Sequence, residues 1–356
     1  MIFDFLKKSS GIESLPEFDN HKLVIKIENK NASLRGFIAI HNNNLGSPAV
    51  GGTRMFPYKS EKDALIDVLK LSRAMTYKCA IAKVPYGGAK GVIIGNPNKD
   101  KTKKLLKKYA ESVNSLKGDF CTGEDVGITQ DDVNVMLKSS DYFIGKPELA
   151  GDPSPYAALS IFYSMKSAVS YAYKKNSLKG FKVAIKGVGK VGKELAKLLY
   201  DNGAELYISD VDKKAINEIR LKITKVKIIS NKKINTLPVD IYSPCALGDE
   251  FSIKNAGQIK ARIICGGANN QLADNEVGDW FFRHSVIYVP DYVANSGGLI
   301  NVVDELEKNG YKKNRVLRRI HGVKNTVKNI LTLSDQKNKS PHRIADEIAE
   351  KLFMIK

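Results

Sequence analysis

The segment Gly187-Val188-Gly189-Lys190-Val191-Gly192 constrains the fold of this chain more than any other stretch. It follows the apolar run Val183-Ala184-Ile185 and precedes a helix predicted over 191–202, which stops at Gly203. The first glycine allows a tight turn, the second lets backbone N–H groups approach a pyrophosphate, and the third allows close helix–strand packing. The helix N-terminus adds partial positive charge for phosphates. We therefore expect this segment to bind a dinucleotide.

Strand-like and helix-like segments alternate regularly through the second half of the chain. Repeated β-α units of this kind form a doubly wound parallel sheet. The predicted strands are 183–185, 205–210, 226–230, 239–243, 262–265 and 286–289.

An acidic residue ends the strand that follows the glycine-rich segment. Asp210 lies eighteen residues after Gly192, where a carboxylate can accept hydrogen bonds from both hydroxyls of the adenosine ribose. The same charge repels a 2′-phosphate, and Asp212 adds to that repulsion, although Lys213 and Lys214 soften it. The sequence therefore favours NAD over NADP as the cofactor.

The first half mixes strands and helices. Residues 23–27 and 34–41 have strand character, and a helix is predicted to begin near Ser60, with Ser60 and Asp63 approximating a capping box. That helix should deliver Lys78 at or just beyond its C-terminal end.

The segment 151–155, Gly-Asp-Pro-Ser-Pro, breaks regular structure between the two halves. A length of 356 residues suits two domains of roughly 100–200 residues. We predict an α/β fold with an N-terminal domain over 1–150 and a Rossmann-like NAD-binding domain over 151–324. The helical segment 325–356 is expected to pack back on the first domain.

Composition excludes several other classes of protein. The chain carries 57 Lys+Arg against 38 Asp+Glu, but the basic residues are spread along it without regularly placed aromatics, so we expect a solvated surface and no nucleic-acid partner. The four cysteines and five histidines show no metal-ligand spacing, so no metal site is expected. Without a signal peptide or a long apolar run, the chain is predicted to be cytoplasmic, with no membrane contact.

One lysine of the first half stands in an unusual setting. Lys90 lies in the segment Gly87-Gly88-Ala89-Lys90-Gly91. Glycines let a backbone approach closely and can hold one side chain in a narrow cleft. A lysine that is desolvated there has a lowered pKa and exchanges protons near neutral pH.

Several motifs in the same order resemble the glutamate/leucine/phenylalanine/valine dehydrogenases, and most closely their leucine dehydrogenase branch. The match runs from about residue 35 to residue 305. The motifs are Val50-Gly51-Gly52-Thr53-Arg54-Met55, Met75 to Lys78, Gly87 to Lys90, Glu124 to Gly127, Pro244 to Gly248, Cys265 to Asn270 and Pro290 to Gly298.

The resemblance implies a role for each matching residue. Lys78 would bind the substrate carboxylate, Lys90 would be the general acid/base that activates water, and Asp125 would shuttle protons at the amino nitrogen. Asn269 would help hold substrate and nicotinamide ribose, with Ala246 and Asn270 also near the cofactor. The reaction implied is reversible NAD-dependent oxidative deamination to a 2-oxo acid and ammonium. The active-site cleft would lie between a substrate and oligomerisation domain and the NAD domain of a homo-oligomer, a dimer or larger.

The substrate side chain is expected to be apolar. Glutamate dehydrogenases place a lysine where this chain has Val50, and a buried carboxylate without a partner would cost roughly several kcal/mol. By resemblance, the substrate site would comprise Val50, Gly51, Gly52, Gly123, Leu299 and Val302. Leucine, valine and isoleucine fit such a pocket, and Gly123 leaves room for the ring of phenylalanine.

One region departs from the pattern of the family. Ala157 stands where a threonine usually helps to hold the nicotinamide carboxamide. This departure leaves open a catalytically weakened NAD-binding protein with a regulatory role. Separately, a related dehydrogenase for another side chain, such as tryptophan, also stays open.

Overall fold

The structure of the protein is a computed structural model that describes residues 2–5, 11–246 and 248–354. The chain divides into two compact units, and the division after Asp152 falls within the proline-containing segment 151–155. The first unit comprises residues 1–152, 302–311 and 349–356, and the second comprises residues 153–301 and 312–348. Most of the segment 325–356 therefore groups with the second unit, and its last eight residues group with the first.

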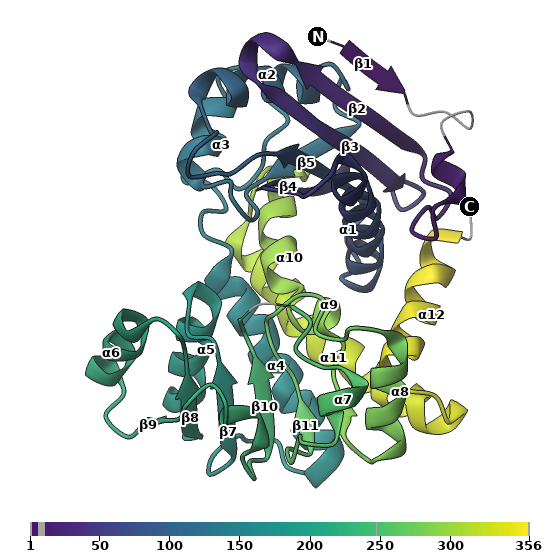
Figure 1. Ribbon diagram of the computed structural model, residues 1–356. Helices are drawn as coiled ribbons and strands as arrows, with labels where there is room; N and C mark the ends of the chain where they lie inside the picture. The colour runs from purple at the N-terminus through teal and green to yellow at the C-terminus, as the bar shows by residue number, and fades with distance from the viewer. Residues whose placement is uncertain (1, 6–10, 247, 355–356) are drawn as a thin grey trace. The chain divides into compact units, whose positions relative to one another are not determined.

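The first unit is built on a mixed six-stranded sheet (Figure 1). The order is β1-β2-β3-β5-β4-β6. The neighbours β1 and β2, β2 and β3, and β3 and β5 pair antiparallel, whereas β4 pairs parallel with both β5 and β6. The strands are β1 (Ile2–Phe5), β2 (Leu23–Asn29), β3 (Leu34–Asn42), β4 (Ala49–Phe56), β5 (Gly87–Ile94) and β6 (Phe120–Gly123).

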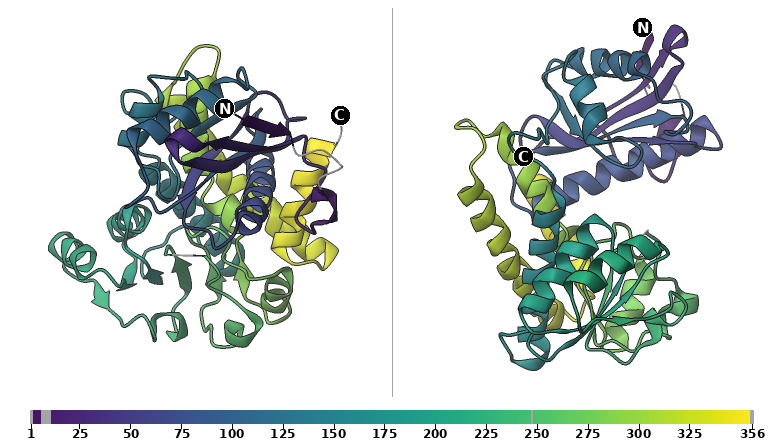
Figure 2. Two further views of the ribbon diagram at one scale, coloured as in Figure 1. Left: turned by 45° about the horizontal axis from the view of Figure 1, so that its top comes forward. Right: turned by 90° about the vertical axis from the view of Figure 1, so that its left-hand side faces the viewer.

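Helices cover the two faces of this sheet, with α1 (Glu61–Ile81) on one side (Figure 2). Val68 and Leu69 of α1 pack there on Phe37 and Val92 of the sheet. On the other face lie α2 (Lys103–Asn114) and α3 (Gln130–Met136), whose buried side chains join the larger core of the unit. Because side chains alternate along a strand, each strand supplies both cores.

The second unit contains six parallel strands in the order β12-β11-β10-β7-β8-β9. They are β7 (Lys182–Lys186), β8 (Glu205–Ser209), β9 (Lys227–Ile228), β10 (Ile241–Pro244), β11 (Ile263–Ile264) and β12 (Ile287–Tyr288). Numbered along the chain, this is the 3-2-1-4-5-6 order of dinucleotide-binding sheets, which changes direction between β7 and β10. The predicted two-domain α/β fold with a doubly wound sheet is confirmed.

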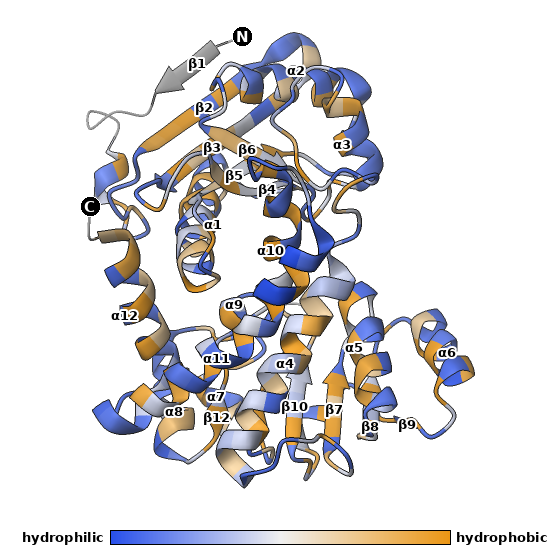
Figure 3. Ribbon diagram, turned by 180° about the vertical axis from the view of Figure 1, so that it is seen from behind, coloured by the Kyte–Doolittle hydropathy of each residue, from blue (hydrophilic) through white to orange (hydrophobic). Residues whose placement is uncertain are grey.

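Amphipathic helices flank this sheet: Figure 3 shows hydrophobic residues concentrated in β7, whereas α5 and α6 carry both hydrophobic and hydrophilic residues. The helices α10 and α12 contribute their last residues to the first unit. The helices are α4 (Ser154–Tyr173), α5 (Lys190–Asp201), α6 (Lys213–Lys222), α7 (Ile253–Ala256), α8 (Asn275–Arg283), α9 (Asp291–Ala294), α10 (Gly297–Val303), α11 (Lys313–Lys337) and α12 (Pro341–Met354).

The predicted helix start near Ser60 is confirmed. The Ser60 hydroxyl accepts the backbone N–H of Asp63 at 3.1 Å, which satisfies one unpaired donor of the first turn of α1. Helix α1 continues to Ile81, so Lys78 lies inside its last turn and not beyond its end. None of the helices among the described residues is long and apolar enough to cross a membrane.

Candidate active site

The centre of the candidate site in the first unit is an ion pair between Lys90 and Asp125. Lys90 lies in β5 and is only 4% exposed, and its Nζ donates to Oδ2 of Asp125. Its strand position pairs with Ala39 of β3, on the sheet face that α1 covers. The two charged groups are 35 residues apart in sequence and are brought together by the fold.

The pKa of Lys90 is lowered to about 7, chiefly because burial disfavours the ammonium form. The positive charges of Arg54 and Lys78 act in the same direction, and the negative charge of Asp67 opposes them. A lysine with such a pKa can exist as a neutral amine at neutral pH and can accept a proton. The buried environment expected for Lys90 from its glycine-rich segment is present.

Two glycines of β4 make room for this pair. A Cβ on Gly52 would lie 2.9 Å from the Cβ of Asp125, and a Cβ on Gly51 would lie 1.7 Å from the carbonyl oxygen of Ala89. Both contacts are too short for a real side chain. Gly51 and Gly52 are therefore required by the packing of the turn that carries Asp125 and of strand β5.

Lys78 lies in the last turn of α1, and its charge lowers the pKa of Lys90 and of Cys79. Helix α1 is anchored just before it, where the imidazole Nδ1 of His41 and the hydroxyl of Thr76 are hydrogen-bonded at 2.8 Å. The described part of the first unit thus places the charges of Lys78, Lys90 and Asp125 where they interact, and the roles predicted for them stay predictions.

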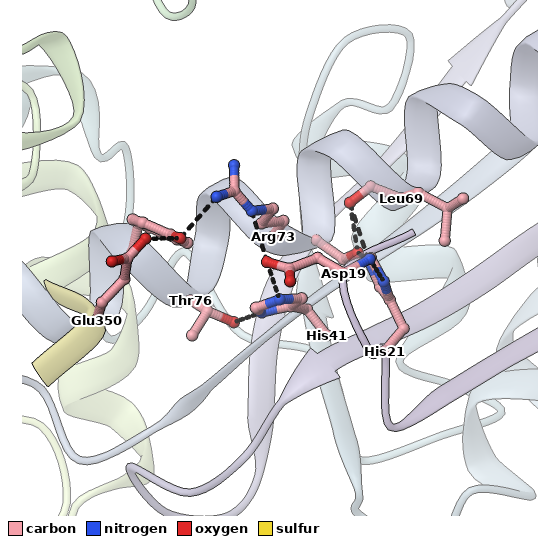
Figure 4. A network of polar contacts seen from close by, with 9 residues as sticks. Asp19, His21, His41, Leu69, Arg73, Thr76 and Glu350 are labelled. Carbon is pink, nitrogen blue, oxygen red and sulfur yellow. Dashed lines mark hydrogen bonds and ion pairs between the residues drawn. The ribbon is translucent and has the colours of Figure 1, made fainter. Parts of the chain in front are cut away.

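The contact at Thr76 belongs to a polar network around α1 that sequence reasoning did not anticipate (Figure 4). Asp19 links His41 at 3.2 Å and Arg73 at 2.7 Å. Arg73 donates to the hydroxyl of Tyr77, which in turn donates to Glu350 at 2.8 Å. His41 and His21 are buried, which lowers the pKa of both imidazoles. The network orders α1 and attaches residue 350 to the first unit.

Val50 and Gly123, two residues of the predicted side-chain pocket, lie on the neighbouring strands β4 and β6. Val50 is fully buried in β4 and pairs with Cys121 of β6, and Gly52 pairs with Gly123 in the same register. A Cβ on Gly123 would lie 2.8 Å from the carbonyl oxygen of Ile144. A side chain at this position would therefore collide with the backbone of Ile144, and the room that Gly123 leaves for a substrate ring stays a prediction.

Two further pocket residues fall in different units. Val302 of α10 belongs to the first unit, where its Cγ1 would lie 3.8 Å from a Cβ on Gly145. Leu299, three residues earlier in the same helix, belongs to the second unit and is buried there.

The glycine-rich turn in the second unit has the geometry that its three glycines predict. Gly187 has φ +92°, and a Cβ on it would lie 2.7 Å from the amide nitrogen of Ala246. A Cβ on Gly192 would lie 2.1 Å from the carbonyl oxygen of Gly187, whereas Gly189 has open space around that position. The first and third glycines are therefore required by packing, and the second exposes backbone to a ligand.

The acidic residue after β8 contacts this turn directly. Asp210 accepts the backbone N–H of Val188 at 2.6 Å through one oxygen and that of Asp212 at 2.8 Å through the other. Lys190 and Val191 begin helix α5, and Ala246 follows β10, the strand next to β7 at the change of direction. These residues fit the phosphates and the ribose of a dinucleotide.

Asn295 of the second unit lies in the motif from Pro290 to Gly298, and the sequence predicted no role for it. Its amide donates to Oδ1 of Asn269 at 2.7 Å and to the carbonyl oxygen of Gly267 at 3.2 Å. Asn269 is thereby oriented, and Asn270 follows it with φ +52°. The Oδ1 of Asn295 is buried without a hydrogen-bond partner, which is costly unless a ligand satisfies it.

The region around Ala157 is held in place by hydrogen bonds of a neighbouring serine. Ala157 is buried in α4. The hydroxyl of Ser160 donates to the carbonyl oxygen of Ala294 at 2.7 Å and accepts the backbone N–H of Gly297 at 2.9 Å. Ser160 therefore joins α4 to the start of α10. Among the described residues, no group of three or more His, Cys, Asp or Glu could hold a metal ion.

Comparison with known proteins agrees with this arrangement. The model of the Glu/Leu/Phe/Val dehydrogenase dimerisation domain matches residues 20–142, and the model of the Glutamate/Leucine/Phenylalanine/Valine dehydrogenase domain matches residues 205–351. The chain is 38% identical to leucine dehydrogenase of Bacillus cereus over 95% of this chain and 92% of the relative. It is 40% identical to phenylalanine dehydrogenase of Lysinibacillus sphaericus over 88% of this chain and 84% of the relative.

A solved structure is also similar. The crystal structure of L-tryptophan dehydrogenase from Nostoc punctiforme superimposes with a TM-score of 0.82 at 36% identity, covering 96% of this chain and 98% of that one.

Proposed function

Because this chain belongs to the Glu/Leu/Phe/Val dehydrogenase family and is an amino-acid dehydrogenase, we propose that it oxidatively deaminates an apolar L-amino acid with NAD. Leucine, valine and isoleucine are the proposed substrates, with phenylalanine as a further one. The products are the 2-oxo acid, ammonium and NADH. The observation that carries the proposal is the buried Lys90 in contact with Asp125, with the charge of Lys78 close by.

Each charged side chain has a separate task in this proposal. The ammonium of Lys78 binds the substrate carboxylate, and Asp125 accepts a proton from the substrate amino group. NAD, when bound, supplies the acceptor for the hydride that leaves the α-carbon. Lys90, as a neutral amine, takes a proton from the water that attacks the imine carbon, and its low pKa makes that form available near pH 7.

The cofactor is proposed to be NAD, bound at residues 187–192 and beside Ala246 and Asn270. Members of the family are NAD(P)-dependent, and NAD as the cofactor is consistent with this. The position of Asp210 against the glycine-rich turn supports NAD over NADP, because its carboxylate would accept ribose hydroxyls and repel a 2′-phosphate.

The apolar preference rests on Val50, which is fully buried where glutamate dehydrogenases place a lysine. Selectivity among apolar substrates should be modest, because each buried methylene contributes about 0.8 kcal/mol, or roughly fourfold. Tryptophan is a second candidate because the tryptophan dehydrogenase of Nostoc punctiforme is 39% identical over 93% of this chain.

NADH formation at alkaline pH, measured across a panel of L-amino acids, tests the proposal. We expect activity with aliphatic substrates above activity with glutamate. The absence of activity with every member would refute the proposal, glutamate above leucine would refute the argument from Val50, and tryptophan above leucine would favour the second candidate.

We also propose a cytoplasmic homo-oligomer. The match of residues 20–142 to a dimerisation domain supports the oligomer, and the four free cysteines suit a reducing compartment. Light scattering after size exclusion tests the first point, and a monomer would contradict it. Cell fractionation tests the second.

A further inference from the structure

Arg54 contacts the charged pair of the candidate site, although its sequence motif suggested no role for it. It lies in β4, two residues after Gly52. Its Nη1 donates to Oδ2 of Asp67 at 3.1 Å, and its Nη2 lies 3.7 Å from Oδ1 of Asp125. The guanidinium therefore stands between a carboxylate of helix α1 and the carboxylate that contacts Lys90.

Asp67 is itself held in place. The hydroxyl of Tyr58 donates to the same Oδ2 of Asp67 at 2.5 Å, and the side chain of Asp67 is 26% exposed. Arg54 is 24% exposed, and its Nε is buried without a hydrogen-bond partner. The terminal nitrogens of Arg54 therefore provide its contacts with the two carboxylates, which fixes the direction of the guanidinium plane.

The two oxygens of Asp125 meet different partners. Oδ2 accepts from Lys90, while Oδ1 accepts the backbone N–H of Val126 at 2.5 Å and faces Arg54. The side chain of Asp125 is 19% exposed, so solvent can still reach it. A carboxylate with the Lys90 amine on one oxygen and the Arg54 guanidinium facing the other has little freedom to rotate away from Lys90.

The charges that act on Lys90 come from three elements packed around it. Arg54 stands on β4, Asp67 and Lys78 stand on α1, and Asp125 stands on the turn after β6. The opposite neighbour on β3 is Ala39, which carries no charge. Arg54 and Lys78 favour the neutral amine, whereas Asp67 and the contacting carboxylate of Asp125 favour the ammonium.

We propose that Arg54 is a positioning residue: anchored by Asp67, it holds the Asp125 carboxylate beside Lys90 and adds a fixed positive charge near the Lys90 amine. For catalysis this rests on the proposed function, because it assigns Arg54 to the reaction of Lys90 and Asp125. The charge effect on Lys90 is a property of the folded chain and can be measured without turnover.

The first experiment follows the titration of Lys90 in the full-length protein labelled with ¹³C at lysine Cε, whose chemical shift reports protonation of Nζ. The Lys90 resonance is identified by its absence in a Lys90→Met variant. Arg54→Met should raise the titration midpoint by about one pH unit, because a neighbouring like charge has been removed. Arg54→Lys should leave the midpoint near that of the wild type, and Asp67→Asn should lower it.

The matched control is Arg35→Met, which removes an exposed arginine from β3 of the same sheet and should not change the midpoint. An unchanged midpoint in Arg54→Met would overturn the charge effect. If Arg54→Met fails to fold, as judged by circular dichroism, the opposite shift expected in Asp67→Asn still decides the question.

The second experiment separates positioning from substrate binding by steady-state kinetics with NAD and the preferred amino acid. Arg54→Lys and Arg54→Met should both lower kcat about tenfold or more with little change in the KM of the amino acid, because Asp125 is less well placed. A raised KM with unchanged kcat would overturn the positioning role and make Arg54 a ligand of the substrate carboxylate.

The two experiments also distinguish this inference from the proposed function. If the wild-type protein oxidises no amino acid and the Lys90 midpoint still moves in the Arg54 and Asp67 variants, the proposed function fails and the charge effect stands. If the wild-type protein is active and the midpoint does not move, the proposed function stands and this inference fails.

Discussion

Lys90 is expected to set the acid limb of the pH–rate profile for amino-acid oxidation. The reaction needs the neutral amine, so activity should rise as the pH rises through the pKa of Lys90 in the folded protein. With the pKa at about 7, roughly nine-tenths of the sites carry the neutral amine at pH 8. An unperturbed lysine with a pKa of about 10.4 would be neutral in only about four sites in a thousand at that pH.

The magnitude follows from this comparison. Burial should increase the active fraction at pH 8 by more than 100-fold relative to an exposed lysine, and below pH 7 the rate should fall tenfold per pH unit. The assay measures kcat/KM for L-leucine oxidation by NADH absorbance from pH 5.5 to 10.5, with NAD saturating. Lys90→Arg serves as the matched variant, because it stays charged throughout this range and should lose on the order of 100-fold or more in kcat.

The substrate ammonium group titrates in the same experiment, but its contribution is identical for all variants of the enzyme. An acid limb near pH 10 with no plateau around pH 8 would refute the argument that burial of Lys90 prepares it as a base. Full activity of Lys90→Arg would refute its role altogether.

Three further changes test the cofactor site. Gly192→Ala places a Cβ 2.1 Å from the carbonyl oxygen of Gly187, so the turn must move and kcat/KM for NAD should fall on the order of 100-fold, measured by initial rates. Asp210→Ala should raise the KM for NAD about tenfold or more and improve the use of NADP, and unchanged preference would contradict the ribose contact. Ala157→Thr should lower the KM for NAD about fivefold if a hydroxyl there binds the nicotinamide, and a loss of activity would instead show that the closely packed neighbourhood of Gly298 cannot accept it.

The dinucleotide-binding unit could be predicted in detail because its constraints are local. Gly187 needs a positive φ, and Gly192 must lie directly against the preceding turn, so both requirements are visible in a few adjacent residues. Asp210 could be placed because parallel strands end at the same edge of a sheet. The alternation of strand-like and helix-like segments in the second half then predicted the order of the elements.

The charged pair was predicted only in part. The glycines around Lys90 indicated a buried lysine, and the resemblance to a family placed Asp125 with it. The contacts of Arg54 with Asp67 and Asp125 were missed, since they join a strand, a helix and a turn that are distant in sequence. The charge of Arg54, two residues after Gly52, could have indicated a role in the site. However, no local sequence pattern predicts which carboxylates this arginine contacts.

The sequence alone determined where this chain must turn, which strands and helices alternate, and which residue types could carry hydride-transfer and proton-transfer chemistry. Only the tertiary structure decided that the carbonyl of Ile144 fills the space beside Gly123, and that residues 302–311 group with the first unit. The physical reason is that backbone conformation and hydrophobic periodicity act over a few residues. Space and charge around a side chain depend on elements that packing brings together from distant parts of the chain.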